Sequence, residues 1–164
     1  MSSERLKDKV ILVTGGNTGI GRAIAERCLK EGASVAVHGL DLDAVKAAAL
    51  EMGPNAFGIA GDLENTDTPS RIVDDAIDHF GRLDGVVNNA AIITRASFSD
   101  TNAAMFDQTM AINVRAPFLI CQAAEPHLKA SKGCVVNIGS INAHGGEGIL
   151  SAYSVSKGAL QTMS

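Results

Sequence analysis

The chain has 164 residues, 46% of them hydrophobic, and a formal net charge of −4. This length is typical of one domain, and the apolar content is enough for a substantial core. The sequence has neither a basic stripe nor a long apolar run, which argues against a nucleic-acid partner and a membrane span. The polar start, residues 1–9, lacks the apolar stretch of a signal peptide, so we expect a cytoplasmic protein.

Apolar runs and helical patterns alternate along the chain. The runs are continuous, as is typical of strands covered on both faces, and we expect strands at 9–16, 34–39, 56–62, 83–90 and 133–140. Helical periodicity predicts helices over 20–30, from Asp41 or Asp43 to about 52, over 67–81, over 101–130 and from about 152 onward. In the fourth of these helices, Pro117 and Pro126 are expected to cause irregularities.

This alternation predicts an α/β fold with a doubly wound, Rossmann-type parallel sheet. We expect five strands in the order 3-2-1-4-5, and residues 1–164 as a single dinucleotide-binding domain. A six-stranded fold of this kind needs one more strand, and the last helical pattern has no closing signal. The domain is therefore expected to be incomplete at its carboxyl end, which would leave the fifth strand with an open edge.

A glycine-rich turn, Thr14–Gly21, joins the first expected strand to the first expected helix. Such a turn gathers backbone N–H groups and the positive end of a helix at one point, where a phosphate fits. The segment also approaches the loop of nucleotide triphosphatases. However, Arg22 and Ala23 replace the lysine and the magnesium-binding hydroxyl which that loop requires. A dinucleotide is the better match.

Polar residues follow several of the other expected strands, and they should share the ligand edge of the sheet with the glycine turn. They are Asp62, Asn88–Ala91 and Ser140. The only tyrosine, Tyr153, precedes Lys157 by four residues, which places both side chains on one helix face. An ammonium about 4 Å from a phenol favours the phenolate by roughly 4 kcal/mol at an effective dielectric near 20. That is about three pKa units, and desolvation acts in the opposite direction. We expect the net effect to bring the tyrosine toward the range where it exchanges a proton with an alcohol.

Together these motifs resemble the short-chain dehydrogenase/reductase family from about Lys9 to the end of the chain. The resemblance implies that Asn113 holds a water, Ser140 binds the substrate oxygen, Tyr153 is the acid/base and Lys157 binds the nicotinamide ribose. It implies cofactor-binding roles for Gly15, Asn17, Thr18, Gly19, Ile20, Gly21, Asp62, Leu63, Asn89, Ala90, Tyr153 and Lys157. Ala91 departs from the glycine that is more common in the family at this turn.

The resemblance implies NAD or NADP as cofactor, and the sequence favours NAD. No arginine or lysine is positioned for a 2′-phosphate, and Thr18 stands where NADP-preferring relatives often have a basic residue. Asp41, twenty residues after Gly21, is either the acid that binds the ribose or a helix cap.

The expected function is an NAD(P)-dependent oxidoreductase that interconverts a secondary alcohol and a ketone, with a small-molecule substrate. We expect a homo-oligomer if the fold is complete. The alternative is a truncated or non-catalytic dinucleotide-binding module of the same family. Neither the three cysteines nor the four histidines have metal-ligand spacing, so no metal site is expected, and only His144 falls near the chemistry.

Overall fold

The computed structural model describes residues 4–164 and contains one parallel sheet of five strands in the order β3-β2-β1-β4-β5. The strands are β1 (Val10–Val13), β2 (Ser34–Gly39), β3 (Ala56–Ala60), β4 (Gly85–Asn88) and β5 (Cys134–Asn137). The α-helices are α1 (Gly19–Lys30), α2 (Leu42–Met52), α3 (Thr68–Phe80), α4 (Ala103–Met110), α5 (Ala116–Ser131) and α6 (Ser151–Met163). The predicted doubly wound fold and strand order are therefore confirmed.

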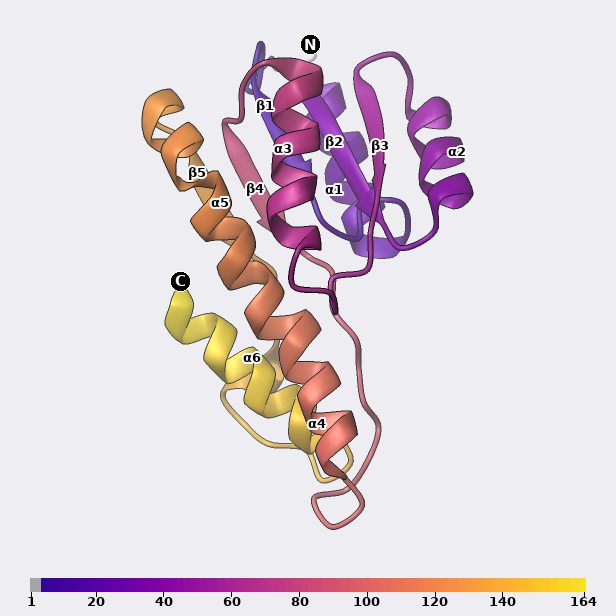
Figure 1. Ribbon diagram of the computed structural model, residues 1–164, viewed down its shortest axis with the longest axis vertical. Helices are drawn as coiled ribbons and strands as arrows, with labels where there is room; N and C mark the ends of the chain where they lie inside the picture. The colour runs from indigo at the N-terminus through magenta and orange to yellow at the C-terminus, as the bar shows by residue number, and fades with distance from the viewer. Residues whose placement is uncertain (1–3) are drawn as a thin grey trace.

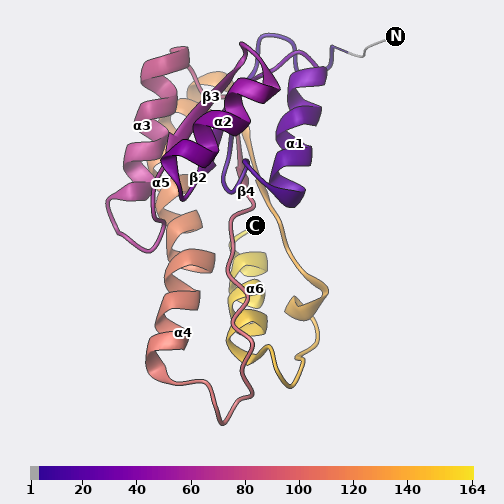
Figure 2. The same ribbon diagram turned by 90° about the vertical axis from the view of Figure 1, so that its right-hand side faces the viewer.

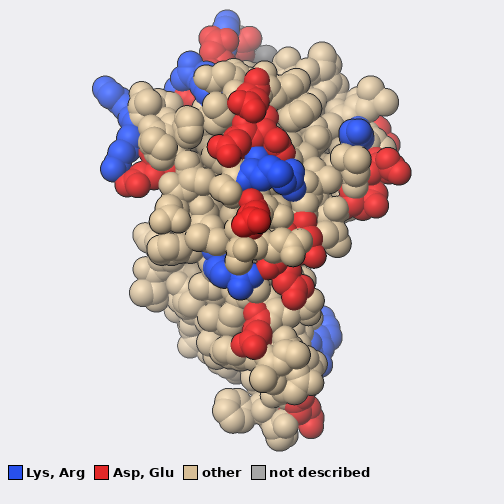
Figure 3. All heavy atoms as spheres, in the orientation of Figure 1, with Lys and Arg blue, Asp and Glu red and all other residues tan. Residues whose placement is uncertain are grey.

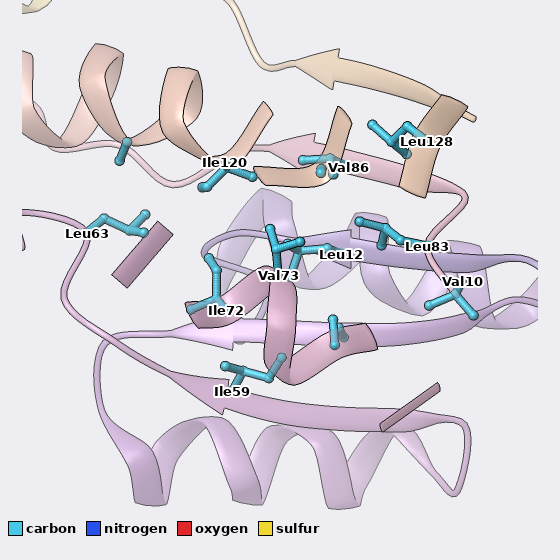
Figure 4. Packing of buried hydrophobic residues seen from close by; sticks show 14 residues of the cluster. Val10, Leu12, Ile59, Leu63, Ile72, Val73, Leu83, Val86, Ile120 and Leu128 are labelled. Atoms are coloured by element: carbon cyan, nitrogen blue, oxygen red, sulfur yellow. The ribbon is translucent and has the colours of Figure 1, made fainter. Parts of the chain in front are cut away.

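Each face of the sheet has its own apolar core, because successive side chains of a strand point to opposite faces. On β1, Val10 and Leu12 pack toward α3 and α5, whereas Ile11 and Val13 pack into the second cluster with Ala25 of α1. Figures 1 and 2 show α3 and α5 on one side of the sheet and α1 on the other, and Figure 4 shows the first cluster from close by. Burial on both sides explains the continuous apolar runs of the sequence.

Helix α2 packs on the same side of the sheet as α1 through Val45. Helices α4 and α6 extend beyond the sheet, past the carboxyl ends of the strands (Figures 1 and 2). The face in Figure 3 has acidic and basic side chains interspersed over its upper part, while its lower part is mostly uncharged. None of the helices among residues 4–164 is long and apolar enough to cross a membrane.

The long helical stretch that was predicted over 101–130 is interrupted, although not at its prolines. A π-helical turn, η1 (Ala111–Arg115), separates α4 from α5. Pro117 lies in the first turn of α5, where a missing N–H is tolerated, and Pro126 lies inside α5 without ending it. Pro126 thus does not break the helix, and the interruption lies at η1, which contains Asn113.

Strand β5 forms the open edge of the sheet, as predicted. It pairs with β4 from Gly85↔Cys134 to Asn88↔Asn137, and it has no second partner among the residues that the structure describes. Val135 and Val136 are 37% and 47% exposed, in contrast to the fully buried centre of the sheet.

Candidate active site

The glycine turn is shaped by close backbone contacts. Gly15 has φ +61°, a left-handed conformation that favours glycine. A Cβ on Gly21 would overlap the carbonyl oxygen of Gly15 and the side-chain amide of Asn89. The start of α1 can therefore approach the turn only because position 21 has no side chain.

The N-terminus of α1 is open to a ligand. Thr18 is the N-cap, yet its side chain makes no capping hydrogen bond, and no acidic residue lies in the first turn. By contrast, Asp41 caps α2 through Ala44 N, and Asn102 caps α4 through Met105 N. The first N–H groups of an α-helix have no partner within the helix, so those of α1 fit the phosphates of a dinucleotide. Gly19, Ile20 and Asn17 lie at this open end.

Thr14 connects the glycine turn to the end of β4. Its Oγ1 accepts hydrogen bonds from the backbone amides of Asn89 and Ala90, each with a donor–acceptor distance of 3.0 Å. Asn89 Nδ2 donates in return to Thr14 O at a distance of 2.9 Å and to Gly15 O at 3.2 Å. Ala91 does not adopt a left-handed conformation, so the departure from glycine at this position causes no backbone strain.

Three of the other predicted cofactor-binding residues, Asp62, Leu63 and Asn17, have different surroundings. Asp62 Oδ1 accepts a 2.9 Å hydrogen bond from Glu64 N, within its own exposed loop. The side chain of Leu63 is buried in the core between the sheet and α3, which leaves its backbone for a ligand. Asn17 lies against Gly39, where a Cβ would be 2.7 Å from Asn17 Oδ1. Asn17 thus occupies the space above the end of β2 that a larger side chain at position 39 would need.

Asn113 is a buried connector of three segments. Its Oδ1 accepts a hydrogen bond from Ile92 N, and its Nδ2 donates one to Ile92 O; both bonds are 2.9 Å long. Nδ2 also donates a 3.0 Å hydrogen bond to Ser156 Oγ, and Ser156 Oγ donates a 2.7 Å hydrogen bond to Tyr153 O. Both amide hydrogens of Asn113 are therefore engaged, so any water that it holds must bind elsewhere on the residue.

Tyr153 and Lys157 lie on one face of α6, as their spacing predicts. Lys157 is only 3% exposed, and its Nζ lies 5.8 Å from the centre of the Tyr153 ring. Nζ donates a 2.6 Å hydrogen bond to Ile138 O, just past the end of β5. Burial lowers the pKa of Lys157 from its ordinary value.

Ser140 follows Ile138 by two residues and is half-buried, as is Tyr153. Ser140 Oγ accepts a 3.2 Å hydrogen bond from Asn142 N, at the start of the short helix η2 (Ile141–Ala143). The hydroxyl hydrogen of Ser140 is thereby left for another acceptor. Because Lys157 binds the carbonyl of Ile138, it is anchored on the same segment that carries Ser140.

Two residues near the site are absent from the sequence prediction. Ser156 has a local signal, because it follows Tyr153 by three residues on the same helix. His38 has none, since the strand pattern alone does not show what surrounds its ring. The predicted neighbour of the chemistry, His144, is exposed and lies 3.3 Å from the side chain of Gln161.

Comparisons with known proteins establish the family of the chain. The family model for short chain dehydrogenases matches residues 9–164. The chain belongs to the short-chain dehydrogenase family. Its predicted family resemblance is thereby confirmed, and the family assignment covers the glycine turn, the strand ends and the Tyr153–Lys157 pair together.

Relatives support the assignment over nearly the whole chain. The chain is 39% identical to 2-(S)-hydroxypropyl-CoM dehydrogenase 3 of Xanthobacter autotrophicus, with 96% of this chain and 64% of the relative covered. It is 35% identical to a sorbitol dehydrogenase of Cereibacter sphaeroides, with 95% and 62% covered. The crystal structure of 3-ketoacyl-(acyl-carrier-protein) reductase from Brucella melitensis, complexed with NADH, superimposes with a TM-score of 0.91 at 29% identity. That match covers 96% of this chain and 67% of the reductase. The chain thus spans less than two thirds of the length of the two dehydrogenases.

Proposed function

We propose that the chain carries the site of an NAD(P)-dependent oxidoreductase that interconverts a secondary alcohol and a ketone. The observation that carries this proposal is the buried Lys157, which is held by Ile138 O beside the ring of Tyr153. The buried amine thus lies over the ring of the only tyrosine of the chain, on the same face of α6. Its position on the segment of Ser140 joins it to a second substrate-binding group.

Each residue has a separate task in this proposal. Tyr153 Oη accepts a proton from the alcohol during oxidation and returns it to the ketone oxygen during reduction. Ser140 Oγ donates a hydrogen bond to the same oxygen. Lys157 would bind the nicotinamide ribose, while Asn113 and Ser156 hold α6 in place. A bound nicotinamide would supply the hydride transfer.

The open N-terminus of α1 would hold the cofactor pyrophosphate, with Gly15 and Gly21 allowing close approach. NAD is the proposed cofactor, because Asp41 is the acidic residue near the end of β2. NADP remains the alternative, since the carboxylate of Asp41 already caps α2. The substrate would be a small alcohol or ketone.

The decisive experiment replaces Tyr153 with phenylalanine. We expect Tyr153→Phe to abolish oxidation of a panel of secondary alcohols while the affinity for NADH, followed by fluorescence titration, stays within about twofold of the unsubstituted chain. The loss isolates the hydroxyl, because phenylalanine keeps the ring. Turnover that survives in Tyr153→Phe contradicts the proposed role.

A non-catalytic dinucleotide-binding module is the second candidate. The observation that favours it is the open edge of β5, where Val135 and Val136 are partly exposed among the residues that the structure describes. This reading predicts that the chain binds NADH but oxidises no alcohol, even without substitution. Any steady turnover that depends on Tyr153 excludes it.

Assembly into a homo-oligomer also remains a proposal. Phe106, Phe118 and Val155 are 38%, 56% and 51% exposed on α4, α5 and α6, and burying such side chains favours association. Light scattering after size-exclusion chromatography would give the mass in solution. A monomer at high concentration would contradict the proposal for this chain.

A further inference from the structure

His38 is a buried polar residue that the proposed chemistry does not use. It lies near the end of β2 and is 3% exposed. Its ring reaches two other segments: Nε2 lies 3.0 Å from Gly61 O, just beyond β3, and Nδ1 lies 3.4 Å from Gly15 N in the glycine turn. In addition, Gly16 N donates a 2.8 Å hydrogen bond to the backbone oxygen of His38.

These partners assign one form of the imidazole. A carbonyl oxygen such as Gly61 O can only accept, so Nε2 carries the hydrogen. Nδ1 is then free to accept from the amide of Gly15, which can only donate. A charged imidazolium would set two N–H groups against each other at Gly15. Burial, the main cause, lowers the pKa of His38 to about 4, so the ring is neutral near neutral pH.

Gly15 is thereby held from both sides. His38 binds its N–H from β2, and Asn89 Nδ2 binds its C=O from the end of β4. The carbonyl of Gly15 also touches the backbone where α1 begins, since it would overlap a Cβ on Gly21. A shift of Gly15 toward Gly21 must therefore move the N-terminus of α1.

We propose that His38 is a positioning residue for the dinucleotide turn: its neutral imidazole fixes Gly15 between β2 and β4 and so places the open N-terminus of α1 for the cofactor phosphates. This inference rests on the proposed function, because it deepens the account of the same cofactor site. It assigns a role to a side chain that contacts no phosphate itself. The cradle is arranged before the ligand arrives, which reduces the ordering that binding must impose.

Three substitutions separate the two ends of the ring. His38→Asn keeps an amide oxygen near the position of Nδ1, so it can still accept from Gly15 N. His38→Gln can donate toward Gly61 O but offers no acceptor at the Nδ1 position. His38→Leu removes both polar ends at similar volume. His79→Leu is the control outside the glycine turn, because His79 is exposed on α3 and stacks on the ring of Phe57 with 3.8 Å between the ring centres.

The first readout is the dissociation constant for NADH. We expect His38→Leu and His38→Gln to raise it about tenfold, the factor that corresponds to about 1.4 kcal/mol, whereas His38→Asn stays within about threefold. His79→Leu should leave it unchanged even where urea unfolding shows a lower stability. Equal NADH affinity in His38→Leu and the unsubstituted chain overturns the proposal. So does a failure of His38→Asn to retain affinity at normal stability.

The second readout needs no cofactor. Long-range ¹H–¹⁵N spectra of the unsubstituted chain should show His38 protonated at Nε2 and bare at Nδ1. Hydrogen exchange at the Gly15 amide should be slow in the unsubstituted chain and in His38→Asn, and fast in His38→Leu. If the unsubstituted chain binds no NADH, the proposed function fails, while exchange at Gly15 still decides the role of His38. Fast exchange at Gly15 in the unsubstituted chain overturns that role.

Discussion

Asn113 Nδ2 donates a 3.0 Å hydrogen bond to Ser156 Oγ, 43 residues further along the chain. Ser156 Oγ in turn donates a hydrogen bond to the backbone oxygen of Tyr153. Asn113 also binds both the backbone N–H and the backbone C=O of Ile92. A single amide thus joins the π-helical turn, the segment after β4 and α6. The placement of Tyr153 therefore depends on a distant residue as well as on its spacing from Lys157.

Replacement of Asn113 by alanine should destabilise the fold. Asn113→Ala leaves Ile92 N and O without their partners, and an unsatisfied polar group in a protein interior costs about 1–3 kcal/mol. We expect the free energy of unfolding in urea to fall by about 2–3 kcal/mol. Ser156→Ala is the control and should cost about 1 kcal/mol, since it removes only one end of the chain of bonds. Equal losses in the two variants would contradict the connector role.

Two glycines of the cofactor turn should respond differently to alanine. Gly21→Ala forces a Cβ into the carbonyl of Gly15, so we expect a stability loss of about 3 kcal/mol and at least tenfold weaker NADH binding. Gly19 has φ +54°, and a Cβ on this residue would meet no atom within 4 Å, so Gly19→Ala should cost only about 1 kcal/mol.

The space in front of Gly19 is nevertheless where a phosphate would lie. We therefore expect Gly19→Ala to weaken NADH binding as well, which fluorescence titration would measure. Unchanged NADH affinity in Gly19→Ala would place the pyrophosphate elsewhere.

Asp84 should make stability depend on acid. The residue is 5% exposed; its burial alone would raise the pKa, but hydrogen bonds from Arg82, Val10 N and Lys9 outweigh burial and lower it. Because the folded-state pKa lies below the unfolded value, the stabilisation is present above about pH 4 and is lost as pH falls through the folded pKa.

Asp84→Asn should therefore lower the free energy of unfolding by about 2 kcal/mol near neutral pH, and the gap should narrow toward about pH 3. Urea unfolding at both pH values would measure it. Asp75→Asn is the control, because the exposed Asp75–Arg71 pair should contribute less than about 0.5 kcal/mol. A gap that stays constant with pH would assign the loss to packing.

Asp41 tests the cofactor preference. Serine also caps helices, so Asp41→Ser should keep the bond to Ala44 N and change stability by less than about 0.5 kcal/mol. If the carboxylate binds the ribose, the ratio of NADPH to NADH affinity should rise about tenfold in this variant. Asp43→Ser, in the first turn of α2, should leave the ratio unchanged. An unchanged ratio in Asp41→Ser would restrict Asp41 to capping.

Local pattern was sufficient for the five strands, for their parallel sheet and for the helices outside residues 101–130. The run Val10–Val13 with its glycine turn is readable because strand burial, turn chemistry and helix onset all operate within a few residues. Helix α3 likewise has Pro69 in its first turn and ends at Gly81 with φ 75°. The four-residue spacing of Tyr153 and Lys157 places them on one face for the same local reason.

Packing decided what a local window does not contain. The π-helical turn lies at Ala111–Arg115, before Pro117, where Asn113 meets partners 21 and 43 residues away. His38 looks like an ordinary strand residue, yet its ring joins the glycine turn to the end of β3, each 23 residues distant. Such roles arise only when folding brings a donor and an acceptor together and excludes water from both, which makes the bond between them matter.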